Sequence, residues 1–263
     1  MNLEQITKQV CNLSRAAGLF IQEEAAKFTA RDIQIKGRNN FVTYVDKESE
    51  RRLVSELGKI IPGSGFITEE DTVEQSQKKF TWIIDPLDGT TNFIHHLPIF
   101  SISIALMHKQ KIIAGVIYEI NNDECFYGWE GGGAFLNEKA IKVSETKKLD
   151  QAFLATGFPY YDYSHMDNYL ALFRESLEKA RGIRRMGSAA VDLAYVACGR
   201  FDGFFEYGLN PWDIAAGAFI IKQAGGQVVN FKNGTNFLFE KEIVSTNGHI
   251  HHEFMTLVRN CFG

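Results

Sequence analysis

Several features that assign a chain to a specialised environment are scarce in this 263-residue sequence. Only four cysteines occur, scattered and without a Cys-x-x-Cys pair, so we expect neither a disulfide framework nor a cysteine metal site. No apolar run approaches the length of a membrane span, and the first residues lack the apolar core of a signal peptide. We therefore expect a cytoplasmic protein that has no membrane partner.

Basic residues are fewer than acidic residues. The 28 Lys and Arg residues are outnumbered by 32 Asp and Glu residues, which gives a net charge of -4, and no dense basic run stands out. This balance favours a protein without a nucleic-acid partner. Hydrophobic residues make up 45% of the chain and charged residues 23%, the proportions of a soluble globular protein.

The first half of the chain contains two predicted helices and a series of predicted strands. Apolar residues recur at helical spacing over residues 3–25, and a second helix is predicted from about 46 to 61. Two short apolar runs, 65–68 and 80–85, predict buried strands that each end in acidic residues. Strand-like segments separated by polar turns from 101 to 143 predict an antiparallel meander.

After about residue 145 the predicted strands alternate with predicted helices. Such alternation is typical of a layered α/β half with a sheet of its own. We therefore predict an α/β (α+β) fold with two sheets, each covered by helices. Residues 1–263 would form one unit, with halves at about 1–145 and 146–263.

The segment WIIDPLDGTTNF, residues 82–93, contains the strongest chemical signal. A predicted strand places Asp85 at the carboxyl edge of a sheet, and Pro86 then turns the chain so that Asp88 returns beside Asp85. Two carboxylates and the Leu87 carbonyl in one concavity repel one another unless a cation lies among them. All-oxygen ligands suit Mg²⁺ or Mn²⁺. The backbone N–H groups at the predicted helix start that follows suit a phosphate.

A plainer interpretation is that Asp85 and Asp88 only polarise a turn and cap a helix, because Asp is common at turns. Two further acidic clusters favour a metal site instead. Glu69, with its neighbour Glu70, follows a predicted buried strand, and Asp213 lies at the start of an apolar helix, where it could also be an N-terminal cap. Three acidic clusters, each at an element boundary, favour one shared metal site over three unrelated caps.

Phosphatases of the haloacid dehalogenase type are a close alternative. Their motif is a strand followed by Asp-x-Asp-Gly-Thr, and it usually opens the domain. Here two residues, Pro86 and Leu87, separate the carboxylates, and the corner lies well inside the chain. The spacing therefore excludes that family.

Four segments together resemble the inositol monophosphatase family, within the fructose-1,6-bisphosphatase-like superfamily of Mg²⁺-dependent, lithium-sensitive phosphatases. They are FVTYVDKESE, FITEE, WIIDPLDGTTNF and GSAAVDLAYVACGRFDGFFEYGLNPWDIAAGAFIIKQAGG. The resemblance covers nearly the whole chain, and the acidic corner combined with the downstream Trp-Asp segment is highly specific. It implies a layered αβαβα sandwich, which agrees with the two predicted sheets, and a phosphoric monoester hydrolase.

The resemblance also implies a set of metal ligands for Mg²⁺, with Mn²⁺ as a substitute. Glu69, Asp85 and the Leu87 carbonyl would hold a first ion. Asp85, Asp88 and Asp213 would hold a second ion, and a third, looser ion would lean on Glu69.

Catalytic and substrate contacts are implied in the same way. Thr90, with Asp46 behind it, would help Glu69 to orient and deprotonate the attacking water. The N–H groups of Gly89 and Thr90 would bind the phosphate, and Ala189, Glu206 and Asp213 would contact the sugar-like part of the substrate. Asp88 is implied as a further substrate-binding residue.

The sequence leaves the roles of several further residues open. Lys36 matches a lysine on a mobile loop near the third metal. The chain departs from the family pattern at Thr68, which replaces a Gly, and at Asn40, which replaces an Asp and leaves the details of that loop open. The sequence also leaves open the roles of four basic side chains, Arg184, Arg185, His95 and His96.

The expected reaction is hydrolysis of a small phosphorylated polyol or sugar, with inositol 1-phosphate as the leading substrate. Relatives acting on NADP, fructose 1,6-bisphosphate or histidinol phosphate share the same metal corner, so these substrates remain alternatives. A non-catalytic interaction protein on the same fold is a further alternative, although no ligand position is missing. Because the family often forms homodimers, a homodimer is expected.

Overall fold

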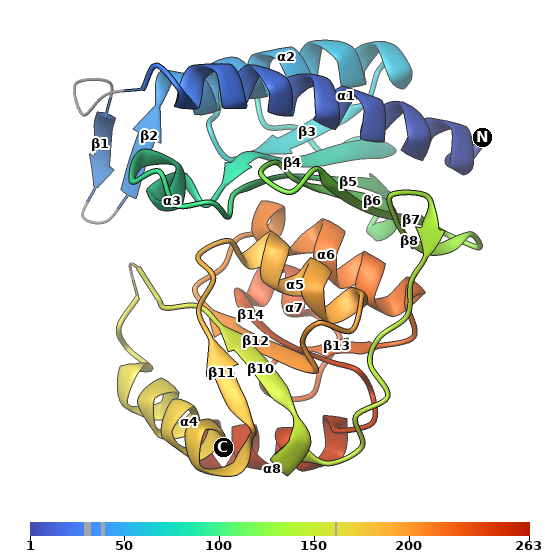
Figure 1. The fold of residues 1–263 in the computed structure, drawn as a ribbon. Coiled ribbons are helices and arrows are strands. Elements are labelled where there is room, and N and C mark those ends of the chain that lie inside the picture. Colours follow the sequence, from blue (N-terminus) through green and yellow to red (C-terminus); the bar gives the residue numbers. More distant parts are fainter. Residues whose placement is uncertain (29–32, 38–39, 161) are drawn as a thin grey trace.

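The structure is a computed structural model that describes residues 1–28, 33–37, 40–160 and 162–263, and it contains five layers in the order αβαβα (Figure 1). An outer helical layer covers a seven-stranded sheet, a second pair of helices separates this sheet from a five-stranded sheet, and a third pair covers the far side. The three pairs are α1 (Leu3–Ala25) with α2 (Tyr44–Ile60), α5 (Ala189–Ala197) with α6 (Pro211–Gln223), and α4 (Met166–Lys179) with α8 (His251–Phe262). The predicted two-sheet sandwich is confirmed.

The seven-stranded sheet has its strands in chain order, so it is built from neighbouring segments of the sequence. Its first two strands are parallel and all later pairs are antiparallel, which confirms the predicted meander. The strands are β3 (Gly65–Thr68), β4 (Phe80–Asp88), β5 (Ser101–His108), β6 (Lys111–Glu119), β7 (Glu124–Trp129), β8 (Gly133–Leu136) and β9 (Lys139–Ala140). One prediction was wrong in detail: β4 does not end at Asp85 but continues through Pro86 to Asp88.

The five-stranded sheet mixes parallel and antiparallel pairs in the order β11-β10-β12-β14-β13. Strand β10 is parallel to both of its neighbours, whereas β14 is antiparallel to both of its own. The strands are β10 (Phe153–Thr156), β11 (Gly182–Arg184), β12 (Gly203–Tyr207), β13 (Gln227–Val229) and β14 (Glu242–Thr246). Helices therefore alternate with strands in this half, as the sequence predicts.

The two helices between the sheets are apolar on all sides because a sheet covers each face of their layer. Every residue of α5 from Ala190 to Ala197 is buried, and so is every residue of α6 from Ile214 to Ile221. Helix α6 approaches β6 closely at Gly115, where an added Cβ would lie 3.0 Å from the Cα of Ala216. This close packing fixes the start of α6, which carries Asp213, against the seven-stranded sheet.

Sequence periodicity did not predict several short elements. They are the hairpin of β1 (Ile33–Gly37) and β2 (Asn40–Thr43), the helix α7 (Phe237–Glu240), the 3₁₀ turn Leu149–Gln151, and β14. The helix start predicted after the acidic corner is that of α3 (Thr90–Ile94). Elements of three to five residues are too short to show a helical or alternating period. Lys36 and Asn40 belong to this hairpin, and their side chains lie outside the part of the chain that the structure describes.

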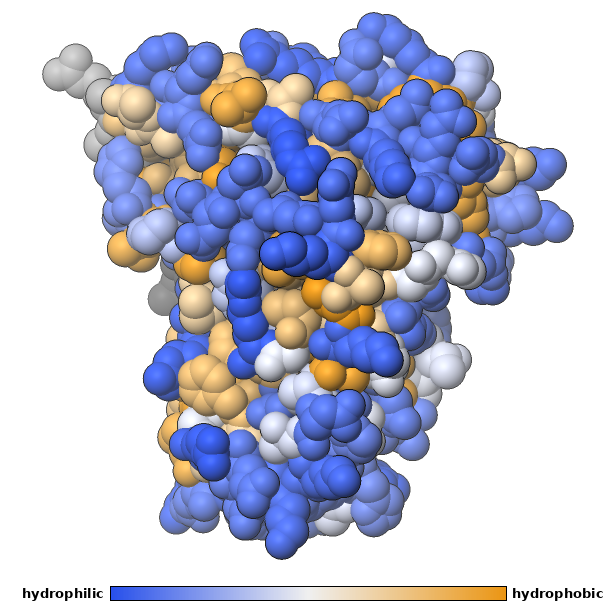
Figure 2. Space-filling view, turned by 45° about the vertical axis from the view of Figure 1, so that its right-hand side comes forward, coloured by the Kyte–Doolittle hydropathy of each residue, from blue (hydrophilic) through white to orange (hydrophobic). Residues whose placement is uncertain are grey.

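On the face seen in Figure 2, polar and charged side chains dominate and apolar residues show only in small areas between them. Within the described ranges, none of the helices combines the length and the apolar character required to cross a membrane.

Candidate active site

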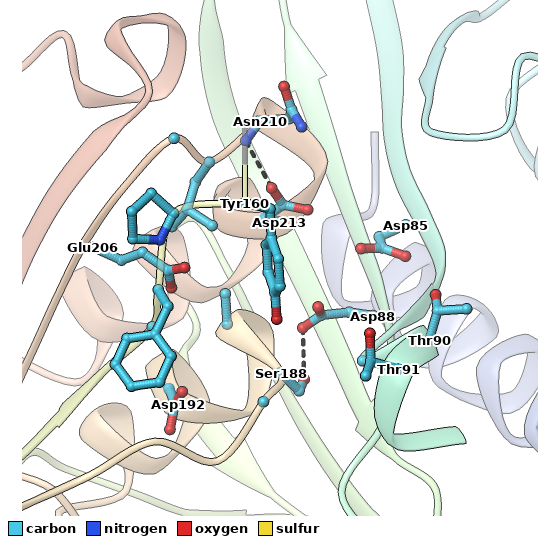
Figure 3. Close-up of a pocket in the computed structure, with 18 of the residues that line it drawn as sticks. Asp85, Asp88, Thr90, Thr91, Tyr160, Ser188, Asp192, Glu206, Asn210 and Asp213 are labelled. Carbon is cyan, nitrogen blue, oxygen red and sulfur yellow. Dashed lines mark hydrogen bonds between the residues drawn. The ribbon is translucent and has the colours of Figure 1, made fainter. Parts of the chain in front are cut away.

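The acidic corner is a bulge in strand β4. Asp85 pairs with Ser103 and Asp88 with Ser101, so three steps along β4 match two steps along β5. Residues three apart in a regular strand point to opposite faces, and the extra residue of a bulge removes this alternation. Both carboxylates therefore point into the same pocket (Figure 3).

Hydrogen bonds hold the backbone of this corner. The Leu87 N–H donates to Oδ1 of Asp85 over 3.0 Å, and the hydroxyl of Ser49 in α2 donates to the Pro86 carbonyl over 3.1 Å. Pro86 has no N–H to donate to the ladder, which suits an irregular position in a strand. The bulge is thus tied to the outer helical layer as well as to β5.

Gly89 turns the chain from β4 into the short helix α3. Its φ of 94° lies in the left-handed region. An added Cβ would also lie 3.0 Å from the Ile99 carbonyl oxygen and 3.2 Å from that of Gly187. Only glycine combines this φ with the lack of a side chain, so the sequence Asp-Gly-Thr is required by the geometry of the turn.

Most of the residues expected from the sequence line one pocket, to which both halves of the chain contribute. The expected residues in its lining are Glu69, Asp85, Leu87, Asp88, Gly89, Thr90, Ala189, Glu206 and Asp213. Asp46 is not in the lining and lies behind Thr90. Residues far apart in the sequence are therefore gathered as the resemblance implies, although their roles remain predictions.

The half-buried Thr90 forms a polar pair with the buried Asp46. Oγ1 of Thr90 lies 3.0 Å from Oδ1 of Asp46 and 3.1 Å from the Leu87 carbonyl oxygen. Oδ2 of Asp46 accepts hydrogen bonds from the backbone N–H and the hydroxyl of Thr43, at 2.8 and 2.5 Å, which caps helix α2. Burial raises the pKa of Asp46, and the hydrogen bonds from Thr43 oppose this rise.

Asp88 connects the two halves of the molecule. Its Oδ2 accepts hydrogen bonds from the Ser188 hydroxyl at 2.5 Å and from the Ala190 N–H at 2.8 Å, both at the start of α5 (Figure 3). Burial raises the pKa of Asp88, while these two hydrogen bonds favour its charged form. One oxygen of Asp88 is thus already engaged by the protein.

Asp213 has a similar double role. Its Oδ2 accepts a hydrogen bond of 2.6 Å from the Asn210 N–H, so it caps α6, which is the plainer interpretation considered for this residue. Its carboxyl group also faces Asp85 across the pocket (Figure 3). Burial and then the charge of Asp88 raise the pKa of Asp213 to about 7. A capping role therefore does not remove it from the pocket.

The carboxyl groups at this end of the pocket destabilise one another in their charged forms. Burial raises the pKa of Asp85 well above its usual range, and the charges of Glu69 and Asp88 raise it further. For Glu69, burial comes first and the charge of Asp213 second. A bound cation would relieve this repulsion, because it compensates several negative charges at once.

The donor set fits a hard cation shared with a substrate phosphate. Within the described ranges, no three His, Cys, Asp or Glu side chains are gathered closely enough to form a metal cage. Mg²⁺ in phosphoryl-transfer sites typically uses one or two carboxylates, several waters and the substrate phosphates. The all-oxygen set of implied ligands, with one oxygen each of Asp88 and Asp213 already engaged, agrees with that mode of binding.

The lining of the pocket also contains residues that were not predicted as site residues. Asp192, Ser188, Tyr160 and Asn210 all belong to the lining. Of the basic side chains whose roles were open, Arg185 lies in the lining, whereas Arg184 is exposed and stacks over the ring of Phe153 at 4.8 Å. His95 and His96 are exposed beyond α3 and outside the lining. The signal that could have revealed Asp192 is a lone charge in an otherwise apolar helix.

The two-sheet fold and its acidic pocket place the chain among the phosphatases that hydrolyse phosphoric monoesters. Sequence comparison then shows that the chain belongs to the inositol monophosphatase family, which it matches over residues 2–261. The predicted family is confirmed.

Individual relatives carry two kinds of name. An inositol-1-monophosphatase from Mesorhizobium japonicum is 40% identical over 244 residues, which cover 92% of each chain. The Nus factor SuhB of Escherichia coli K12 is 41% identical over 235 residues, 89% of this chain and 88% of its own. The solved structure of the inositol monophosphatase from Anabaena superposes with a TM-score of 0.89 at 35% identity, covering 99% of this chain and 97% of that one.

Proposed function

We propose that this phosphatase hydrolyses inositol 1-phosphate, or a closely similar polyol phosphate, in a Mg²⁺-dependent reaction. The observation that carries the proposal is the division of the pocket into two acidic ends. Asp85, Asp88 and Asp213 lie at one end, and Glu206 stands on the wall away from Asp85 (Figure 3). A cation with a phosphate suits the first end, and hydroxyl groups suit the second.

Two groups of oxygen ligands would hold the metal ions. The first group is Glu69, Asp85 and the Leu87 carbonyl, and the second is Asp85, Asp88 and Asp213. A third ion would be held more loosely at Glu69, and Mn²⁺ could replace Mg²⁺. When bound, the ions supply Lewis-acid chemistry, which lowers the pKa of water and stabilises charge on the phosphoryl oxygens.

The Thr90 hydroxyl is suited to orient the attacking water. Its single proton is directed to Asp46 or to the Leu87 carbonyl, so its lone pairs are free to accept a hydrogen bond. Glu69, which lines the same pocket, would receive the proton of that water. The backbone N–H groups of Gly89 and Thr90 would hold phosphate oxygens.

The alcohol part of the substrate would lie along Ala189, Glu206 and Asp213. The Glu206 carboxylate packs directly against the backbone of Gly157, where an added Cβ would lie 2.0 Å from its oxygen and would occupy the same space. Buried carboxyl groups that lack a ligand remain unpaired, so such a site discriminates strongly against esters without hydroxyl groups. This property favours an ester that carries hydroxyl groups over one that lacks them, such as phenyl phosphate.

A panel of phosphate esters tests the proposal. Phosphate release is measured from inositol 1-phosphate, NADP, fructose 1,6-bisphosphate, histidinol phosphate and phenyl phosphate, with Mg²⁺ and with excess chelator. The expected result is the highest kcat/KM for inositol 1-phosphate and no release in chelator. A higher kcat/KM for NADP would overturn the substrate assignment, and full activity in chelator would overturn the metal assignment.

A role as a Nus factor is a second candidate, favoured by the 41% identity to the Escherichia coli protein of that name. Such a role would require a macromolecular partner, in contrast to the expectation drawn from the net charge. Because a binding role does not need the metal ligands, Asp85→Asn separates the two candidates. Partner capture retained by an inactive Asp85→Asn protein would favour the second function, and sedimentation of the same samples would test for the homodimer.

A further inference from the structure

Asp192 is a buried acid that lines the pocket. It lies in the first turn of α5, is 1% exposed, and every other buried residue of that helix is apolar. Its Oδ1 is fully buried and has no hydrogen-bond partner among the residues that the structure describes. Most buried side-chain oxygens in folded proteins are paired, so an unpaired carboxyl oxygen requires an explanation.

Capping of α5 does not explain the position of Asp192. An acid in the first turn of a helix can pair with free backbone N–H groups. Here the Val191 N–H already donates to the Ser188 hydroxyl over 3.3 Å, and the Ala190 N–H donates to Asp88 over 2.8 Å. The local donors are therefore taken by other residues.

The charged neighbours of Asp192 do not pair with it either. Asp88 and Glu206 carry the same charge as Asp192. Arg185 carries the opposite charge, but its guanidinium donates to the Tyr160 hydroxyl and packs 5.4 Å from the ring centre of Phe158. Nε of Arg185 is itself buried and has no partner in the described part of the chain.

Both unpaired groups belong to residues that line the proposed substrate pocket. Figure 3 shows Asp192 with Glu206 on the side of the pocket away from Asp85. This is the side on which the alcohol part of a phosphate ester would lie if its phosphate were at the Asp85 end. An unpaired acceptor on Asp192 and an unpaired N–H donor on Arg185 thus line one pocket, and the two side chains are near enough for the charge of Arg185 to lower the pKa of Asp192.

We propose that Asp192, together with Arg185, binds a hydroxyl group on the alcohol part of the substrate and thereby selects polyol esters. A hydroxyl is the neutral group that can both donate to a carboxylate oxygen and accept from an N–H. An ester without this hydroxyl leaves both protein groups buried and unpaired, so it binds less well. The inference rests on the proposed function, since it assumes a phosphate at the Asp85 end.

Steady-state kinetics with two substrates tests the selectivity. Asp192→Asn and Asp192→Leu are compared with the unaltered protein on inositol 1-phosphate and on phenyl phosphate. The expected result is a KM for inositol 1-phosphate that rises on the order of 10-fold or more, as for the loss of a hydrogen bond to a charged group. The rise in KM for phenyl phosphate should be much smaller. The KM for inositol 1-phosphate should rise less in Asp192→Asn than in Asp192→Leu.

Thermal unfolding without substrate distinguishes binding from a structural role. Because Asp192 is buried without a partner, Asp192→Leu should raise Tm. The matched control is Asp202→Leu, because Asp202 is also buried but accepts hydrogen bonds from the Ser144 hydroxyl and the Phe153 N–H. This control should lower Tm and leave the preference between the two substrates unchanged.

Two results would overturn the inference. One is a fall in Tm for Asp192→Leu comparable to that for Asp202→Leu, and the other is an equal change in KM for both substrates. If the unaltered protein hydrolyses neither ester, the proposed function fails instead. In that event the lack of hydrolysis would also refute the proposed binding of a substrate hydroxyl by Asp192. A rise in Tm would then show only that Asp192 is an unpaired buried group.

Discussion

The Thr90 hydroxyl lies 3.0 Å from Oδ1 of Asp46 and thereby joins the acidic corner to helix α2. Asp46 in turn is held by Thr43, so the orientation of Thr90 depends on a chain of buried hydrogen bonds. Because this chain contains none of the implied metal ligands, its loss should change water orientation more than metal binding.

Thr90→Ala should therefore lower kcat by about 10²-fold, the range of general-base assistance, with little change in the Mg²⁺ concentration needed for activity. Thr90→Ser keeps the hydroxyl and is the control, which should retain most of the activity. Single-substrate kinetics over a Mg²⁺ titration provides both values. An alanine variant as active as the unaltered protein would refute the proposed role of Thr90.

Asp85→Asn should abolish turnover, because Asp85 is the implied ligand of both main ions. In the unaltered protein Mg²⁺ should raise Tm, since a ligand that binds the folded state stabilises it, and this rise should be lost in the variant. Ca²⁺ should inhibit because it is larger and takes more ligands, and Li⁺ should inhibit as the family resemblance implies. Asp167→Asn, at an exposed position on α4, is the control.

A persistent rise in Tm with Mg²⁺ in Asp85→Asn would show that the metal is bound elsewhere. Equal turnover by Asp85→Asn and Asp167→Asn would contradict the assignment of the acidic corner itself.

Glu50 of helix α2 should act as a positioning residue for Glu69. It is fully buried, and its carboxylate accepts hydrogen bonds from the Glu70 N–H at 2.7 Å and from the Thr72 N–H and hydroxyl at 2.8 and 2.6 Å. Glu50→Gln replaces one acceptor oxygen by an NH₂ group. We expect a loss on the order of 10-fold in Mg²⁺ affinity or kcat, as for other residues that orient metal ligands.

The matched control is Glu48→Gln, because Glu48 is on the same helix but pairs with Arg52 at the surface over 2.9 Å. It should leave both the Mg²⁺ titration and kcat unchanged. If Glu50→Gln behaved like Glu48→Gln, the turn that carries Glu69 would not depend on α2.

The stability of the metal-free protein should fall as the pH rises from about 4 to about 7. The pKa of Asp213 in the fold is about 7, against an ordinary value of 3.8, so the folded state holds a proton that the unfolded chain releases in this range. Stability falls with pH wherever the folded state binds more protons. Asp85 and Glu69, whose pKa values are also raised, act in the same direction.

Thermal unfolding at several pH values, in chelator and in Mg²⁺, measures this effect. The fall in Tm should be smaller in Mg²⁺, because the charged carboxylates are then compensated, and smaller in Asp213→Asn than in the unaltered protein. A Tm in chelator that is independent of pH would indicate that these carboxyl groups titrate normally in the fold.

Much of the fold was predictable because its long elements have strong periods. The helices predicted at 3–25 and at about 46–61 correspond to Leu3–Ala25 and Tyr44–Ile60, and the meander agrees with β5 to β9. Short elements such as α7 and β14 were missed, since a few residues cannot show a period. The end of β4 was misplaced because a proline usually ends a strand, whereas here it lies within a bulge.

The sequence by itself determined the chemistry of the acidic corner, because Asp85, Asp88 and Gly89 are neighbours along the chain and their geometry is local. Only the tertiary structure decided which distant groups complete it. Asp88 is paired at the start of α5, Glu50 holds the turn after Glu69, and Asp192 is left unpaired in the pocket wall. The two hydrogen-bonded relationships join residues that are 20 and 102 positions apart in the sequence. The third depends on which groups do not reach Asp192 in the fold. A local sequence pattern predicts neither, because hydrogen bonding depends on distance in space.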